Sequence, residues 1–168
     1  MSTSTRRETW NINDQFLYHL SFTSDLIGFQ EELMFQETCG ITLAEWRVLS
    51  VVSSFKPISS KDITKVTTLN KVAVSRVLAR LTEKGLIERA VATRDNRMQY
   101  LSLTSAGKQQ FRKARAAFEK WSGSLLGALA PGEIEQLKHY LMKLRKRLGE
   151  ITDEERARNE AFIFGRKP

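Results

Sequence analysis

The segment from residue 71 to residue 103 most constrains what this chain can fold into. Its first part has apolar residues at positions i, i+3, i+4 and i+7, which predicts an amphipathic helix over Lys71–Lys84 with a buried stripe of Val74, Val77, Leu78 and Leu81. Gly85 ends that helix. Two β-capable runs, Leu86–Val91 and Met98–Leu103, then predict a hairpin. A helix-turn-helix followed by a hairpin is a winged-helix arrangement.

Helical patterns surround this segment. A first helix is predicted over Asp14–Thr38, with Asp14 as its N-cap and Gly40 as its stop. A capping box of Thr42 and Glu45 opens a second helix that reaches about Ser53. The fold class is therefore mainly α with a small β-hairpin wing.

Three further elements complete the prediction. Ser59 or Ser60 caps a short helix before residue 70, and Thr104 caps a long helix that runs to about Ala130. A last amphipathic helix is expected over Glu133–Gly149. The charged tail that follows contains the apolar triplet 162–164, which we expect to dock on another surface.

Positive charge is concentrated in the centre of the chain. The whole sequence carries a net charge of +8, from 27 Lys and Arg against 19 Asp and Glu. Residues 56–115 hold 14 of those cations and 4 of those acids, a net charge of +10, so the remaining residues sum to −2. This distribution favours a polyanionic partner over an evenly solvated surface.

Several function classes find little support in the composition. A single cysteine, Cys39, excludes an internal disulfide and a cysteine-based zinc site, and the two histidines lie far apart. No apolar run is long enough to span a membrane, and the polar N-terminus lacks the apolar core of a secretory signal. We therefore expect a cytoplasmic protein without metal or cofactor, and not an enzyme, because no catalytic arrangement rises above chance.

The face of the Lys71–Lys84 helix opposite its apolar stripe predicts contact with DNA. That face carries small, hydroxylated or cationic side chains and has no acid before Glu83. In the major groove, arginine pairs with guanine, serine bonds base edges or phosphate, and valine touches the thymine methyl group. An arginine at the tip of the predicted hairpin can enter the minor groove. The predicted DNA contacts are Ser60, Thr68, Asn70, Lys71, Val72, Ser75, Arg76, Arg80, Arg94, Asp95 and Arg97.

With these motifs in place, the chain resembles the multiple antibiotic resistance regulator (MarR) family. The resemblance rests on the runs 41–49, 81–87 and 103–107, with Ser75-Arg76 and Asp95-Asn96-Arg97 between them. It implies a homodimer whose helical dimerisation region is residues 14–40 and 108–168, with a winged helix-turn-helix lobe at 41–107. It also implies that Arg97 enters the minor groove of a pseudo-palindromic operator and that Asp95 positions it. Ala92 stands where the family often has a further acid.

The same resemblance implies a repressor that a small aromatic carboxylate or phenolic effector releases from DNA. The effector pocket then lies between the first, second and fifth helices. The predicted ligand contacts are Tyr18, His19, Phe22, Trp46 and Arg47, although aromatic residues on an amphipathic helix also serve as core. Cys39 offers a redox-sensing alternative, but it does not lie early in the first helix, where peroxide-sensing relatives place their cysteine.

Other classes stay open on sequence alone. A sequence-tolerant architectural DNA protein would use the same basic lobe without an effector and would bind with steep salt dependence. A winged-helix module that bridges proteins would tolerate charge reversal at Arg76 and Arg80.

Overall fold

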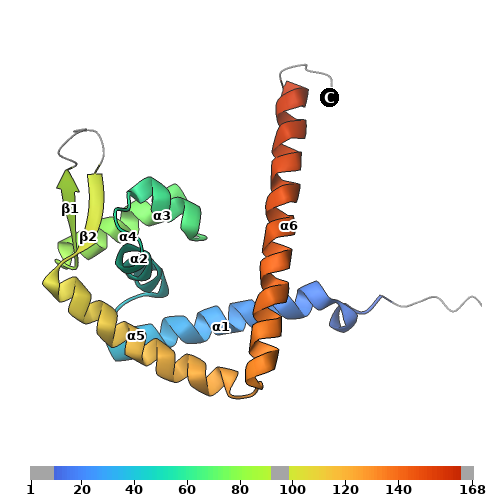
Figure 1. The fold of residues 1–168 in the computed structure, drawn as a ribbon, viewed down its shortest axis with the longest axis horizontal. Helices are drawn as coiled ribbons and strands as arrows, with labels where there is room; N and C mark the ends of the chain where they lie inside the picture. The colour runs from blue at the N-terminus through green and yellow to red at the C-terminus, as the bar shows by residue number, and fades with distance from the viewer. Residues whose placement is uncertain (1–9, 92–98, 164–168) are drawn as a thin grey trace, which may run out of the picture. The chain divides into compact units, whose positions relative to one another are not determined.

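The structure, a computed structural model, describes residues 10–91 and 99–163 (Figure 1). In chain order its elements are the 3-10 turn η1 (Ile12–Asp14), α1 (Phe16–Cys39), α2 (Leu43–Ser54), α3 (Ser60–Val66), α4 (Lys71–Glu83), β1 (Ile87–Val91), β2 (Gln99–Leu103), α5 (Ser105–Leu126) and α6 (Pro131–Ile163). The two strands pair antiparallel, with Ile87 opposite Leu103 and Arg89 opposite Leu101. The predicted fold class, mainly helical with a two-stranded wing, is confirmed.

The chain divides into two compact units, Met1–Lys120 and Trp121–Pro168. The first unit contains the helix-turn-helix, the wing, α1 and most of α5. The second contains the end of α5 and the whole of α6. The predicted assignment of 14–40 and 108–168 to dimerisation, and of 41–107 to DNA binding, stays a prediction about function.

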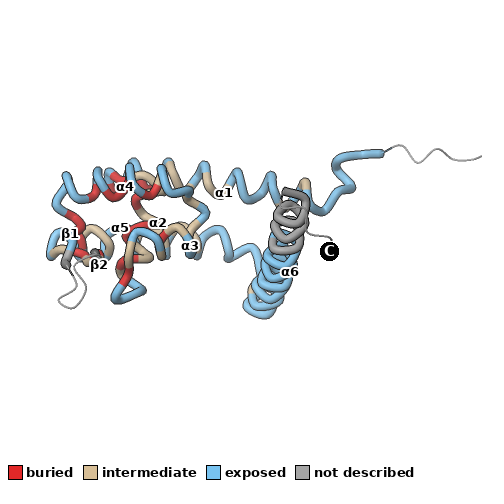
Figure 2. Tube along the Cα trace, turned by 90° about the horizontal axis from the view of Figure 1, so that it is seen from above, coloured by how far each residue is buried: buried red, intermediate tan, exposed pale blue. Residues whose placement is uncertain are grey.

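The core of the first unit lies where α2, α4 and the wing meet, and Figure 2 shows the buried segments gathered there. The predicted stripe of α4 is buried in full: Val74, Val77, Leu78 and Leu81. Two further elements contribute, since Phe35 near the end of α1 and Ala114 of α5 are fully buried in the same cluster. Burial of this stripe fixes which face of α4 is left at the surface.

Helix termini follow the predicted capping chemistry. Thr42 and Glu45 form the capping box of α2, and Ser59 is the residue that caps α3. Gly40 and Gly85 follow α1 and α4 with φ of 65° and 66°, the left-handed conformation that glycine adopts at lowest cost.

Three predicted boundaries were wrong. Asp14 is not the N-cap of α1, because it lies in the separate turn η1 and the helix begins after Gln15. α5 ends at Leu126 and not near Ala130, where the backbone N–H instead donates to the Glu133 carboxylate at 2.8 Å. α6 begins at Pro131 and runs to Ile163, well past Gly149. Proline is favourable in the first helical turn, and a single interior glycine does not stop a helix.

The junction between the wing and α5 is tightly built around Gly107. Thr104 donates its hydroxyl to the Gly85 carbonyl at 2.7 Å and accepts from the Gly107 N–H at 3.0 Å. A Cβ atom at residue 107 would lie 1.9 Å from the Leu86 carbonyl oxygen, closer than any real contact. The close approach of α5 to the start of the wing therefore requires glycine at this position.

We predict that Gly107→Ala destabilises the protein by about 1–3 kcal/mol, the usual cost of overpacking a filled site. Gly123→Ala is the matched control in the same helix, because its Cβ would meet nothing within 4 Å. Urea unfolding of both variants measures the difference. Equal unfolding free energies for the two variants would show that the backbone around residue 107 can move to accommodate a methyl group without loss of stability.

Candidate nucleic-acid interface

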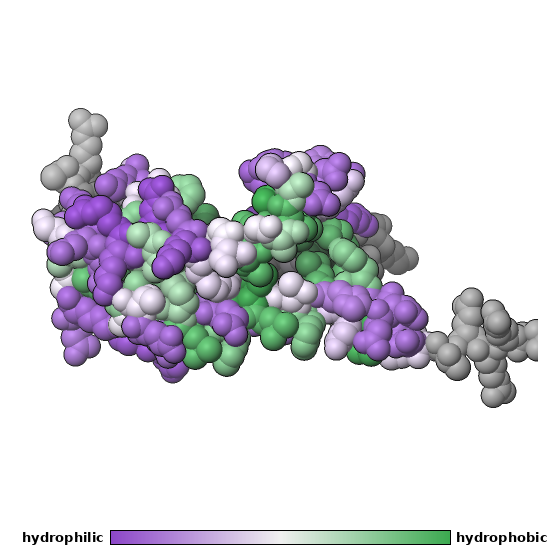
Figure 3. All heavy atoms as spheres, turned by 90° about the horizontal axis from the view of Figure 1, so that it is seen from below, coloured by the Kyte–Doolittle hydropathy of each residue, from purple (hydrophilic) through white to green (hydrophobic). Residues whose placement is uncertain are grey.

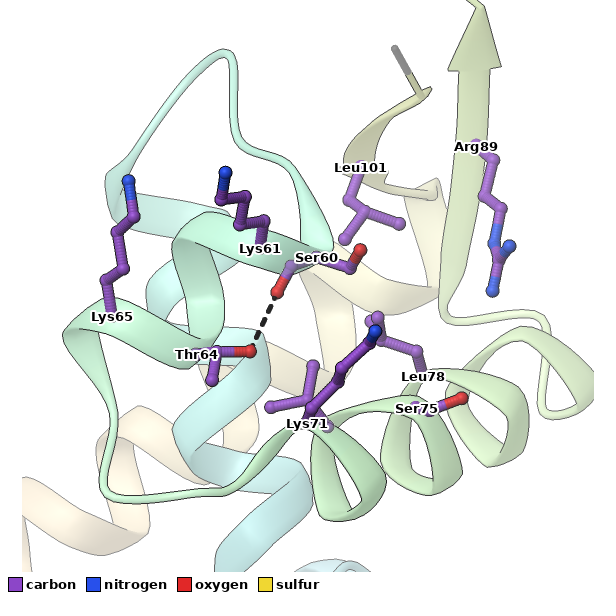
Figure 4. Close-up of a pocket in the computed structure, with 10 residues that line it drawn as sticks. Ser60, Lys61, Thr64, Lys65, Lys71, Ser75, Leu78, Arg89 and Leu101 are labelled. Atoms are coloured by element: carbon purple, nitrogen blue, oxygen red, sulfur yellow. Dashed lines mark hydrogen bonds between the residues drawn. The ribbon is translucent and has the colours of Figure 1, made fainter. Parts of the chain in front are cut away.

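A pocket of about 570 Å³ opens on the surface between α3, α4 and the wing. The residues that line it come from all three elements: Ser60, Lys61, Thr64, Lys65, Lys71, Val74, Ser75, Leu78, Arg89 and Leu101. Figure 4 shows Lys71 approaching from α4 and Arg89 from β1, with Lys61 and Lys65 projecting from α3. The helix-turn-helix and the wing therefore share one continuous surface.

The side chains that line the pocket suit the binding of a polyanion. Buried Val74, Leu78 and Leu101 contribute its apolar part. Four cationic side chains and three hydroxyl groups surround them, and none of the ten described lining residues is acidic. Cations and hydroxyls of this kind bind DNA phosphates.

α3 holds its part of this surface through its N-terminal cap. Ser59 accepts from the Asp62 N–H at 3.3 Å, and the Asp62 carboxylate accepts from the Ser59 N–H at 3.2 Å and from its hydroxyl at 2.6 Å. The hydrogen bonds from the Ser59 side chain and backbone lower the pKa of Asp62 below its ordinary value. The Asp62 carboxylate also lies 3.8 Å from the Lys65 ammonium, so it offsets part of the positive charge of α3.

α4 presents the predicted reading face to solvent. Lys71, Val72, Ser75 and Arg76 are all exposed. Val72 is 58% exposed, so its side chain is open on this face. Of the predicted DNA contacts, Ser60, Lys71 and Ser75 converge on the pocket.

The other predicted DNA contacts have local partners or lie elsewhere. Asn70 caps α4 by accepting from the Ala73 N–H at 2.9 Å, and Thr68 accepts from Arg47 at 3.3 Å. Arg80 lies 3.9 Å from the carboxylate of Glu45, so the negative charge of that buried group partly offsets its positive charge. Arg94, Asp95 and Arg97 lie outside the described residues.

Sequence reasoning missed three of the pocket's cations, Lys61, Lys65 and Arg89. The two lysines stand four residues apart on α3, and Arg89 pairs with Leu101 across the wing. Their positions in the basic block 56–115 were a usable signal. Only the folded arrangement shows that they face the same pocket as Lys71.

The predicted effector residues lie in two groups among the described residues, and their role as ligand contacts stays a prediction. Tyr18 stacks on Phe22 at 5.9 Å near the start of α1, and His19 bonds the Asn13 carbonyl oxygen at 2.6 Å. Trp46 contacts Phe35, which stands 13 residues beyond Phe22 on the same continuous helix, about 20 Å at 1.5 Å per residue.

Trp46 and Arg47 each have structural partners. Trp46 stacks on rings from α1 and α5, with centroid distances of 5.0 Å to Phe35 and 5.6 Å to Phe111. The guanidinium of Arg47 donates to Thr68. Burial raises the pKa of Glu31, and the positive charge of Arg47 opposes that rise. Trp46 therefore belongs to the aromatic core, whereas Arg47 keeps a half-buried charge near α1.

The exposed, acid-poor face of α4, the cationic pocket and the adjoining wing define a winged helix-turn-helix DNA-binding protein. Residues 40–98 match the family model described as "MarR family". The chain is 25% identical over 137 residues to the HTH-type transcriptional regulator YdgJ of Bacillus subtilis, covering 82% of this chain and 81% of that protein.

Solved structures agree with this assignment. A MarR/EmrR family transcriptional regulator from Acinetobacter sp. ADP1 has 28% identity and a TM-score of 0.78, covering 84% of this chain and 99% of the other. MepR of S. aureus, in a structure of its DNA complex, shares the fold at 22% identity and a TM-score of 0.72, covering 81% of this chain and 98% of MepR. Residues 40–98 thus match the MarR family, and most of the chain is similar to HTH-type transcription regulators.

Membrane-spanning and metal-binding features are absent from the described residues. No helix there is both long and apolar enough to cross a membrane. Within the same residues, no group of three or more His, Cys, Asp and Glu side chains comes together as metal ligands would.

Proposed function

We propose that this regulator is a homodimer that represses transcription by occupying a pseudo-palindromic operator and leaves it when a small aromatic acid binds. The observation that carries the proposal is the surface of α4, where exposed Val72, Ser75 and Arg76 adjoin a pocket of four cations. The cations supply affinity for any duplex, and the three α4 side chains supply the choice of sequence.

The reading step follows from the packing of α4. Its apolar stripe is buried, so the helix cannot rotate without exposing that stripe, and its opposite face is held outward. Arg76 has five guanidinium donors and can form a bidentate pair with guanine. Val72, at 58% exposure, can contact a thymine methyl group. A sequence-tolerant architectural protein would have no need of this combination.

Apolar surface on the outer helices supports the homodimer. On α6, large apolar side chains alternate at spacings of three and four residues, the pattern of a helix that packs against other helices: Ile134, Leu137, Leu141, Leu144, Leu148 and Ile151. The last five of these are 36–63% exposed. On α1, Phe16, Leu17 and Phe29 are at least 60% exposed. Figure 3 shows that apolar areas are open on the surface of the chain. Uncovered apolar surface of this extent favours association with a second copy.

Release by an effector requires only that a ligand favour a different spacing of the two lobes. Arg47 supports the choice of an acid, because it brings a half-buried positive charge to α2 directly after Trp46 in sequence. Tyr18, His19 and Phe22 form a second aromatic and polar group on exposed α1.

We predict that Arg76→Ala weakens binding to a duplex selected from random sequence by about 1–3 kcal/mol and relaxes its sequence preference. Lys113→Ala, which removes an exposed cation from α5, is the control for charge alone. Fluorescence anisotropy with selected and scrambled duplexes measures both effects. If both variants lose affinity equally for both duplexes, the protein reads charge and not sequence.

We predict that the double variant Leu141→Glu and Leu144→Glu sediments as a monomer and binds the selected duplex far more weakly than the wild type, which sediments as a dimer. The added charges would have to be buried at the interface, which is unfavourable without partners. Lys143→Glu, on the same helix, tests whether added acid alone has this effect. A double variant that stays dimeric would place the interface elsewhere.

A further inference from the structure

We propose that Glu45 is a positioning residue that fixes the recognition helix α4 for sequence reading. Glu45 is the one charged residue among the buried polar residues of the described chain, with 1% of its surface exposed. It lies in the first turn of α2, away from the reading face of α4. The proposal deepens the proposed function, because it concerns how α4 is held while it reads DNA.

One side of the Glu45 carboxylate closes the N-terminus of α2. Its Oε2 accepts from the Thr42 N–H at 2.9 Å, and the Thr42 hydroxyl accepts from the Glu45 N–H at 3.2 Å. These bonds are the capping box, for which a neutral glutamine would serve as well as a glutamate. The cap alone therefore gives no reason for a buried negative charge.

The same carboxylate also binds the C-terminal end of α4. The Lys84 ammonium donates to Oε1 at 2.8 Å and to Oε2 at 3.0 Å, and Arg80 Nε lies 3.9 Å from Oε1. Lys84 is the C-cap residue of α4, and its backbone N–H donates to the Arg80 carbonyl. A single buried group thus connects the start of α2 with the end of the recognition helix.

Physical chemistry favours an orienting role over a stabilising one. Burying an ion pair costs desolvation free energy that its attraction does not reliably recover, so such pairs contribute little net stability. Apolar contacts such as those of Val77 and Leu81 hold α4 in place but depend weakly on small rotations. A charge-assisted bond is shorter and stronger than a neutral one, so the bond from Lys84 restrains the end of the helix from a buried point.

The connection continues to α1. The Leu43 N–H, at the first position of α2, donates to Glu32 Oε2 at 2.6 Å. The N-terminus of α2 is thereby bonded on one side to α1 and on the other, through Glu45, to α4. With α1 in the dimer, as proposed above, these bonds set the angle of α4 relative to the helix that spaces the two lobes.

Glu45→Gln in the full-length protein separates this role from that of the cap. The amide oxygen can still accept from the Thr42 N–H, but Lys84 loses its counter-charge. We expect affinity for the selected duplex to fall about tenfold, within the range seen when one member of a coupled pair is removed. Affinity for a scrambled duplex should change by no more than about twofold. The loss would oppose simple electrostatics, because removing a negative charge from the protein favours a polyanion.

Variants of the partner complete the test. Lys84→Met should reproduce the loss, Lys84→Arg should retain binding, and Glu45→Gln with Lys84→Met should be no worse than either single change. Glu83→Gln is the control, since it removes an exposed acid next to Lys84 without touching Glu45. Urea unfolding of each variant confirms that the binding assay is done on folded protein.

Three results would be decisive. A selective loss of operator affinity that Lys84→Arg avoids supports the proposal. A fall in unfolding free energy with an unchanged ratio of selected to scrambled affinity overturns it and leaves the proposed function intact. A wild-type protein that shows no preference between the two duplexes overturns both.

Discussion

The structure depends on the burial of one face of α4 against α2 and the wing. Val74, Val77, Leu78 and Leu81 are each at most 2% exposed, and burying such a side chain contributes about 1.5–3 kcal/mol. Because one face of α4 is buried, the side chains on its opposite face remain exposed to solvent. The reading face of α4 is the consequence of the core, and the wing lies beside it because Leu101 and Leu103 complete the same core.

Local sequence patterns predicted most of the fold because the signals that form it are local. The Thr42 and Glu45 capping box, the glycines at 40 and 85, and the spacing of the α4 stripe each act within one or two helical turns. The errors arose where a boundary depended on competing local bonds. Asn11 stabilises a separate turn before α1, and Pro131 starts α6 earlier than its apolar pattern suggested. The helical continuation to Ile163 replaces the charged tail that we had expected.

The candidate site was less predictable because it is assembled from three elements. Lys71 and Ser75 could be recognised on α4, but Lys61 and Arg89 reach the pocket only through the packing of α3 and the wing. The role of the effector residues stays a prediction, and the structure shows only where these side chains lie. Tyr18 lies near the start of α1, whereas Trp46 packs against Phe35 near the end of that helix. The length of α1 therefore separates the two rings. Buried Glu45 was predicted as a cap, whereas its bond to Lys84 joins residues 39 positions apart and has no local signal.

In the proposed dimer, α4 reads the major groove at two fixed positions. Ser75→Cys in a Cys39→Ser background allows an iron chelate to be attached to the reading face, so that bound DNA is cut next to α4. We expect two discrete groups of cuts on a selected duplex, about one helical turn or a multiple of it apart. The same chelate at Lys113→Cys should give no such pattern. Cuts spread evenly along the duplex from Ser75→Cys would contradict the account.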